Sequence, residues 1–95
     1  MKVKVFQIHD RPNVLSFTNY ERVSEEVLYR QVEENLKENP LVSYGKKISG
    51  PSEEIQEYRI DGYPFCLVND FDYGIEIHSE SQEAISKLLE YFEMV

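Results

Sequence analysis

Four residues near the end of the chain are of types that could do chemistry: Asp70, Asp72, Glu76 and His78. Converging carboxylates supply the hard oxygen ligands that a divalent cation prefers, and a histidine beside a carboxylate can act as a general acid or base. The spacing does not match the twelve-residue calcium-binding loop, because Gly74 and Glu76 come too early for it. No nucleophile or oxyanion-hole motif accompanies His78. A small metal-dependent enzyme is therefore an alternative hypothesis.

Simpler explanations account for these side chains. Aspartate is common in turns because it tolerates turn geometry. Cys66 stands in an apolar run, where cysteine usually behaves as a small hydrophobic residue. Glu57 is expected closer to this cysteine than Arg59, so no cation lowers the pKa of the thiol. His9 and Asp10 are adjacent in an expected turn, where both would face solvent. We predict no catalytic residues, no metal site and no cofactor.

The charge of the chain is unevenly distributed. The 95 residues include 18 acidic and 10 basic side chains, for a net charge of −8. Residues 1–51 have a net charge of +1 and residues 52–95 a net charge of −9. Binding to phosphates needs clustered lysine and arginine, so an acidic half argues against direct contact with nucleic acid.

Several sequence features bear on the cellular location. No basic segment followed by an apolar run marks a signal peptide, and no apolar stretch is long enough to span a membrane. The single cysteine cannot form an internal disulfide. We therefore expect a cytoplasmic protein with no membrane contact.

The acidic half suggests a surface that binds another protein. Tyrosine contributes contact area at modest entropic cost, and carboxylates attract a basic partner. We predict a small acidic, non-enzymatic binding protein that engages a basic protein, for example as an inhibitor or an immunity-type protein. The predicted contact residues surround two expected turns: Asp61, Tyr63, Asp70, Asp72, Tyr73 and Glu76.

A third hypothesis is a homodimeric structural module. An edge strand, or apolar surface around Ile55 and Val68, would form the contact between two copies. A mass that depends on concentration would favour the dimer, stabilisation by metal would favour the enzyme, and salt-sensitive capture of a basic protein would favour the binding protein.

Residues 55–79 position the candidate side chains and are typical of a three-stranded antiparallel meander. The dipeptide Asp61-Gly62 suits a two-residue type I′ turn, because both central residues of that turn take positive φ. Ile60 then pairs with Tyr63, and alternate residues of both strands share a face.

The second turn of the meander decides which later residues share that face. We predict a three-residue loop, Asp72-Tyr73-Gly74, whose glycine supplies the left-handed residue of a bulge. Ile75 then pairs with Phe71, and Asp70 lies directly across from Glu76, where two like charges repel. A loop with an even number of residues would move Ile75 to the opposite face. The three-residue loop is preferred because it places the apolar side chains of the meander on one face of the sheet: Tyr58, Ile60, Tyr63, Phe65, Leu67, Phe71, Ile75 and Ile77.

Apolar residues at helical spacing indicate two helices. The first begins after either Thr18 or Ser24, both possible caps, and ends before Pro40. The second follows Ser79, which forms a capping-box pattern with Gln82.

The expected fold is a two-layer α+β sandwich. Its antiparallel sheet has three to five strands, including the C-terminal meander (55–79), and both helices pack on one face. Residues 2–8 and 14–17 are predicted strands, and residues 41–48 are either an edge strand or a loop. The length and composition indicate a single α+β domain over residues 1–95.

Overall fold

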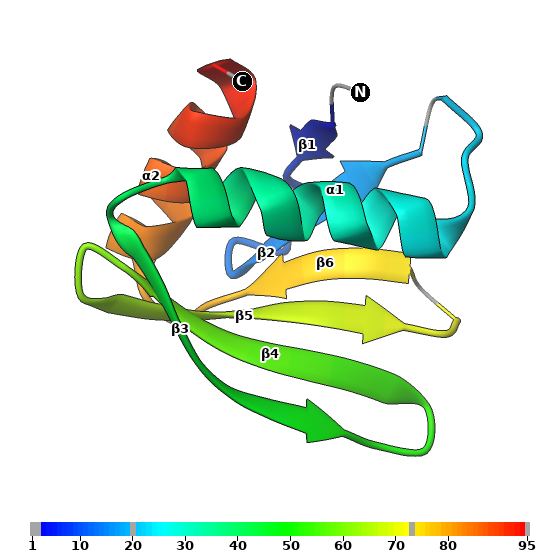
Figure 1. Cartoon of the computed structure of the whole chain (residues 1–95). Coiled ribbons are helices and arrows are strands. Elements are labelled where there is room, and N and C mark those ends of the chain that lie inside the picture. Colours follow the sequence, from blue (N-terminus) through cyan, green and yellow to red (C-terminus); the bar gives the residue numbers. More distant parts are fainter. Residues whose placement is uncertain (1–2, 20, 73, 95) are drawn as a thin grey trace.

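A computed structural model describes residues 3–19, 21–72 and 74–94, which form six strands and two helices (Figure 1). The strands are β1 (Lys4–Phe6), β2 (Val14–Thr18), β3 (Val42–Ser49), β4 (Glu53–Ile60), β5 (Tyr63–Asp70) and β6 (Gly74–His78). The helices are α1 (Glu25–Glu38) and α2 (Gln82–Met94). The strands form one sheet in the order β1-β2-β6-β5-β4-β3, and every neighbouring pair is antiparallel.

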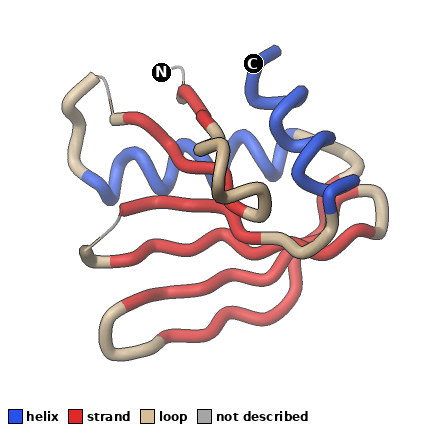
Figure 2. Tube along the Cα trace, turned by 180° about the vertical axis from the view of Figure 1, so that it is seen from behind, coloured by secondary structure: helices blue, strands red, loops and turns tan. Residues whose placement is uncertain are grey.

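Both helices pack on the same face of the sheet, as the views from front and back show (Figure 1, Figure 2). The opposite face, on which no described helix packs, is called the open face below. The predicted α+β class and antiparallel sheet are confirmed, but the described residues contain six strands rather than three to five. The ambiguous segment 41–48 contains most of β3, whose side chains are nearly all exposed. An exposed strand lacks the apolar alternation by which a sequence reveals a strand.

The apolar core lies between the covered face and the helices. The rings of Phe17 on β2 and Phe92 on α2 meet edge to face with centroids 5.1 Å apart. Six of the eight residues expected on the apolar face are buried there, but Tyr63 is 37% exposed and Phe71 is 66% exposed because both border turns. The core includes Leu15, Leu28, Val32, Leu36, Tyr58, Ile60, Phe65, Leu67, Ile75, Ile77, Ala84, Ile85 and Leu88.

Serine side chains start both helices. The Ser24 hydroxyl accepts a hydrogen bond from the first turn of α1, so this helix begins at the second of its two predicted starts. Helix α2 begins two residues later than predicted, because the Ser81 hydroxyl accepts a hydrogen bond from the N–H of Ala84 at 3.2 Å. Ser79 instead donates its hydroxyl proton to the carbonyl of Pro64 at 2.6 Å. This bond ties the segment before α2 to β5.

The first turn of the meander forms as predicted. Asp61 and Gly62 have positive φ angles of 51° and 86°. Ile60 pairs with Tyr63, and the same register continues along the whole of β4 and β5. Two residues with positive φ are the signature of a type I′ turn.

The second turn lies one residue earlier than predicted, which shifts the register of β5 against β6 by two residues. Asp70 pairs with Gly74 and Val68 pairs with Glu76, so the expected pairing of Asp70 with Glu76 is wrong. The Asp70 Oδ1 accepts a hydrogen bond from the N–H of Asp72 at 2.8 Å, which starts the turn at Asp70. Because the shift is two residues, no side chain changes face. The predicted positive φ of Gly74 is present, at 85°.

Gly74→Ala tests the second turn. A Cβ at Gly74 would meet only Glu25 Oε2, at 3.8 Å, so the expected cost comes from the positive φ rather than from a clash. We expect the free energy of unfolding in urea to fall by about 1 kcal/mol. The control Gly45→Ala, at a position without a positive φ where a Cβ would make only ordinary van der Waals contact with Glu57, should change it by less than about 0.5 kcal/mol. Equal effects of the two substitutions would contradict this explanation.

Candidate functional site

The six predicted contact residues do not form one surface. Asp61 and Tyr63 lie at the turn between β4 and β5, whereas Asp70 and Asp72 lie at the other end of β5. Eight residues of extended chain separate the two ends by roughly 23 Å. Glu76 lies between them and is buried, with 7% of its surface exposed. Tyr73 is outside the described residues.

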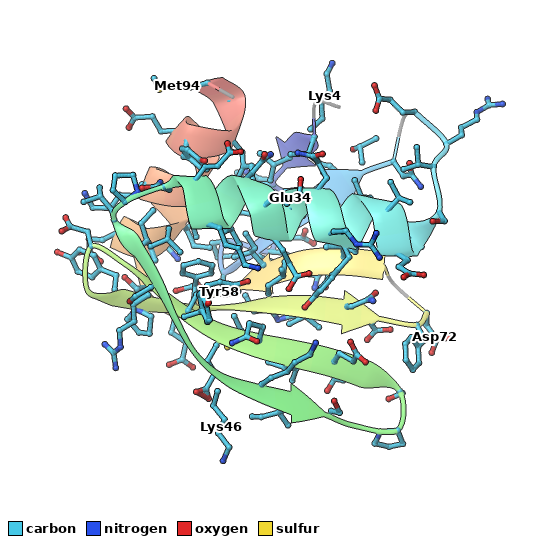
Figure 3. All side chains as sticks on the ribbon, in the orientation of Figure 1. Lys4, Glu34, Lys46, Tyr58, Asp72 and Met94 are labelled. Carbon is cyan, nitrogen blue, oxygen red and sulfur yellow. The ribbon has the colours of Figure 1, made fainter. Side chains whose placement is uncertain are left out.

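Carboxylates from three parts of the chain gather at one end of the sheet. Glu53 on β4 pairs directly with Asp70 on β5, so two like charges face each other across the strands. Glu25 on α1 reaches the neighbouring Gly74 of β6, as its 3.8 Å approach to the Cβ position shows. Asp72 stands at the tip of the adjoining turn (Figure 3). We call this set, Glu25, Glu53, Asp70 and Asp72, the acidic end.

Phe71 lies within the acidic end and is 66% exposed. Its backbone N–H donates to the carbonyl of Ser52 at 3.1 Å, which fixes the turn against the segment before β4. The exposed Phe71 side chain therefore stands on a turn that is anchored to the sheet.

Glu76 is the centre of a polar cluster on the open face. Its Oε2 accepts hydrogen bonds from Arg11 Nη1 at 3.2 Å and from the Ser16 hydroxyl at 3.4 Å. Its Oε1 lies 2.9 Å from His78 Nε2. The Glu76 side chain is only 9% exposed, so these partners replace the water that the carboxylate loses.

A groove of about 860 Å³ lies beside this cluster. Register places Val14, His78, Cys66 and Glu57 in one row across β2, β6, β5 and β4, and all four line the groove. Burial, and secondarily the Glu57 carboxylate, raises the pKa of the Cys66 thiol. The groove therefore presents a protonated thiol and an imidazole, and a raised pKa disfavours a nucleophilic thiolate at neutral pH.

The metal-dependent alternative needs Asp70, Asp72 and Glu76 to converge, which the structure does not show. Glu76 is hydrogen-bonded to Arg11, and Asp70 pairs with Gly74. Within the described parts of the chain, no group of three or more histidine, cysteine, aspartate or glutamate residues is placed to hold a metal ion.

Sequence reasoning missed several members of these clusters. Arg11 stands 65 positions before Glu76, and no local pattern links the two residues. Glu25 lies in the first turn of α1 and Glu53 at the start of β4, far apart in the sequence. Only the strand order and the placement of α1 bring them to Asp70.

No protein-family model, curated protein or solved structure matches this chain. Its fold and candidate sites define a two-layer α+β protein with an acidic end and a groove on the open face of its sheet. In the described part of the chain, no helix is both long and apolar enough to cross a membrane.

Arg11→Ala tests the polar cluster. The substitution leaves the buried Glu76 carboxylate with fewer partners, so the free energy of unfolding should fall by about 1 kcal/mol, a modest value because Arg11 is 43% exposed. Arg11→Ala combined with Glu76→Gln should recover part of this loss, because the uncharged amide needs less compensation. Urea unfolding of the two single variants and the double variant gives the coupling energy. Additive effects would show that the contact does not contribute.

Alkylation of Cys66 tests the electrostatics of the groove. A thiol with a raised pKa contains less thiolate at a given pH, so Cys66 should react with iodoacetamide at pH ~8 more slowly than free cysteine and faster as the pH rises. Glu57→Gln removes one cause of the raised pKa and should accelerate the reaction. Glu54→Gln, on the opposite face of β4, is the matched control and should leave the rate unchanged. The same rate in both variants would contradict this explanation.

Proposed function

We propose that this protein is a small, non-enzymatic binding protein that engages a basic protein partner through its acidic end. The observation that carries the proposal is that the carboxylates of the acidic end meet at the turn that also holds the exposed Phe71. The carboxylates would select a basic surface, and the aromatic ring would contribute apolar contact.

Electrostatics explains why such an arrangement favours a cationic partner. Facing carboxylates repel each other by a small amount in water, and basic side chains between them would turn this repulsion into attraction. The net charge of −8 also raises the rate of encounter with a basic protein. An inhibitor or immunity-type protein could use this surface to block a phosphate-binding cleft, with carboxylates in the place of phosphates.

The other predicted contact residues have different surroundings. Asp61 forms an ion pair with Lys87 at 3.4 Å, and Tyr63 lies beside it at the far end of β5. Glu76 is held by Arg11 and His78. The proposed contact surface keeps Asp70 and Asp72, which lie at the acidic end, and adds Glu25, Glu53 and Phe71 from the same end of the sheet.

The homodimer alternative also has a specific surface, the exposed edge strand β3. Tyr44 is 65% exposed and Ile48 is 43% exposed on this edge. A bulge between Tyr44 and Lys47 interrupts the strand, and Gln56 Nε2 donates to the carbonyls of Gly45 and Lys46 inside it. Bulges and edge lysines are devices that oppose pairing between sheet edges. These features favour the basic-partner proposal over the dimer.

Capture from a lysate of the source cell tests the proposed function. The acidic-end variant Glu53→Gln/Asp70→Asn/Asp72→Asn should bind the partner roughly tenfold more weakly than the wild type, since each exposed charge contributes modestly. The control Glu34→Gln/Glu90→Gln/Glu93→Gln removes the same charge from exposed helix positions elsewhere, and Glu34 stands on the outer side of α1 (Figure 3).

The expected result is a basic protein that the wild type and the control retain at low salt, that the acidic-end variant loses, and that high salt releases. If both triple variants lose the basic protein equally, the attraction comes from the overall charge of the chain and not from the acidic end. Retention by the acidic-end variant, or a retained partner that is acidic, would overturn the proposal.

A further inference from the structure

Strand β4 carries a patterned row of side chains on the open face. The pairing of β4 with β5 and of β5 with β6 aligns the open-face side chains of the three strands. Alternate residues of a strand share a face at a spacing of roughly 7 Å. In order along β4, the open-face residues are acidic, apolar, acidic and basic. They are Glu53, Ile55, Glu57 and Arg59, which we call the β4 row.

The β4 row is accessible along its whole length. None of its four side chains is buried, whereas the neighbouring covered-face residues Gln56, Tyr58 and Ile60 all are. The β1–β2 loop reaches Glu76 on β6, and β4 lies two strands away from β6 in the sheet. The strand can therefore be approached from solvent on the open face.

Strand β3 widens the row rather than covering it. Gly45 adjoins Glu57, because a Cβ at this glycine would lie 4.0 Å from the Glu57 Cβ. Since glycine has no side chain, the Glu57 carboxylate is not screened from that side. Ile48 pairs with Ile55 and is 43% exposed, so the apolar position of the row extends to the edge of the sheet.

The groove on the open face continues the β4 row. Glu57 and Arg59 both line this hollow of about 860 Å³, and their β5 neighbours Cys66 and Pro64 line it between them and the loops opposite. Arg59 Nη1 donates to the carbonyl of Gly62 at 3.1 Å. In the part of the chain that the structure describes, neither Glu57 nor Arg59 forms an ion pair. Both charges are thus available to a ligand in the groove.

The row also begins at the acidic end, because its first member, Glu53, pairs with Asp70. A ligand that contacts the acidic end can therefore continue along β4 into the groove without leaving the open face. The order of charges along this path differs from that of a uniformly acidic surface, since an apolar position separates the two carboxylates and a cation follows them.

We propose that the basic partner lays an extended segment along the β4 row, with basic, apolar, basic and acidic side chains at alternate positions. This inference rests on the proposed function, because it names the part of that partner which makes the contact. The basic side chains meet Glu53 and Glu57, and the acidic side chain enters the groove and meets Arg59. The apolar side chain packs on Ile55 and Ile48.

The spacing favours an extended segment over a helix. Alternate side chains of an extended chain recur at the same interval as those of β4, so each can meet one member of the row. Side chains on one face of an α-helix recur at about 5.4 Å per turn, and the two patterns lose their match over four positions.

A pair of peptides with the same composition tests the pattern. The matched peptide is acetyl-Arg-Ser-Ile-Ser-Arg-Ser-Glu-amide, and the control is the permuted acetyl-Arg-Arg-Glu-Ser-Ser-Ser-Ile-amide. Each is titrated into the isotopically labelled full chain at low salt, and the backbone amide signals are followed by NMR. We expect the matched peptide to shift the signals of Glu53, Ile55 and Glu57 with a dissociation constant on the order of 1 mM, and the permuted peptide to bind at least roughly fivefold more weakly. Equal affinities would overturn the proposal.

A charge exchange at Glu57 tests the register. Glu57→Arg should weaken the matched peptide by roughly fivefold, and a peptide with glutamate in place of its second arginine should recover the affinity. Glu34→Arg makes the same change on the outer side of α1 (Figure 3) and should leave the preference for the matched peptide as it is. If Glu57→Arg keeps that preference as well, the row is not the binding surface.

The apolar position has its own matched variants. Ile48→Ser should weaken the matched peptide by roughly threefold, because the apolar contact is lost. Val27→Ser, at a residue of α1 with 44% exposure, should have no effect on binding. If the mass of the protein alone rises with concentration and Ile48→Ser abolishes this rise, a second copy occupies the row and the proposal is overturned.

The outcome is distinguishable from that of the proposed function. If the matched peptide binds selectively but no basic protein is captured, the proposed function fails and the β4 row stands as a peptide site. If a basic protein is captured through the acidic end but the two peptides bind alike, the β4 row fails alone.

Discussion

The alternation of side chains along antiparallel strands is the constraint on which the other features depend. The pairing that turns Ile75 and Ile77 toward the helices necessarily turns Glu76 and His78 toward the open face. A turn one residue longer or shorter would place the Glu76 carboxylate in the apolar core, at a cost of several kcal/mol unless it became protonated. The Asp72 N–H donates a hydrogen bond to Asp70 Oδ1, which stabilises the turn at the length that the pairing of Asp70 with Gly74 shows. The length of one turn therefore decides which face each side chain of β6 occupies.

Glu76 then imposes a requirement on a distant part of the chain. A carboxylate with 9% exposure needs hydrogen-bond donors in place of water, and its own strand supplies only His78. Arg11 brings a cation from the β1–β2 loop, which lies over the open face (Figure 2). The same loop is tied to the start of α2, because Gln82 Nε2 donates to Asn13 Oδ1 at 2.7 Å. The polar cluster thus connects the first hairpin, the centre of the sheet and the last helix.

How far the sequence predicts this structure depends on how far apart along the chain the interacting residues stand. The Asp61-Gly62 turn and the Ser24 cap involve neighbours in the chain. The turn was predicted, and the cap is one of the two predicted starts of α1. The second turn was misplaced by one residue, and the register by two, because two aspartates near it could each start a turn. The apolar pattern does not reveal this error, since it is unchanged by a register shift of two. Local patterns could not reveal that Arg11 reaches Glu76.

The acidic end was only half predictable for a related reason. Asp70 and Asp72 are close in sequence, but Glu53 meets Asp70 only because β4 lies next to β5 in a register that extends over eight pairs. Glu25 joins them only because α1 starts above the end of β6. Propensity and periodicity describe single elements, whereas the position of a helix over a sheet is decided by how all apolar faces pack together.

Glu53 and Glu54 show how alternation divides the charge of one strand between the two faces of the sheet. As neighbours on β4 they point to opposite faces, so Glu53 pairs with Asp70 on the open face while Glu54 is on the covered face. The two carboxylates therefore have different surroundings although they are adjacent in the sequence, and the pairing of β4 with β5, not the acidic composition, decides which of them joins the acidic end.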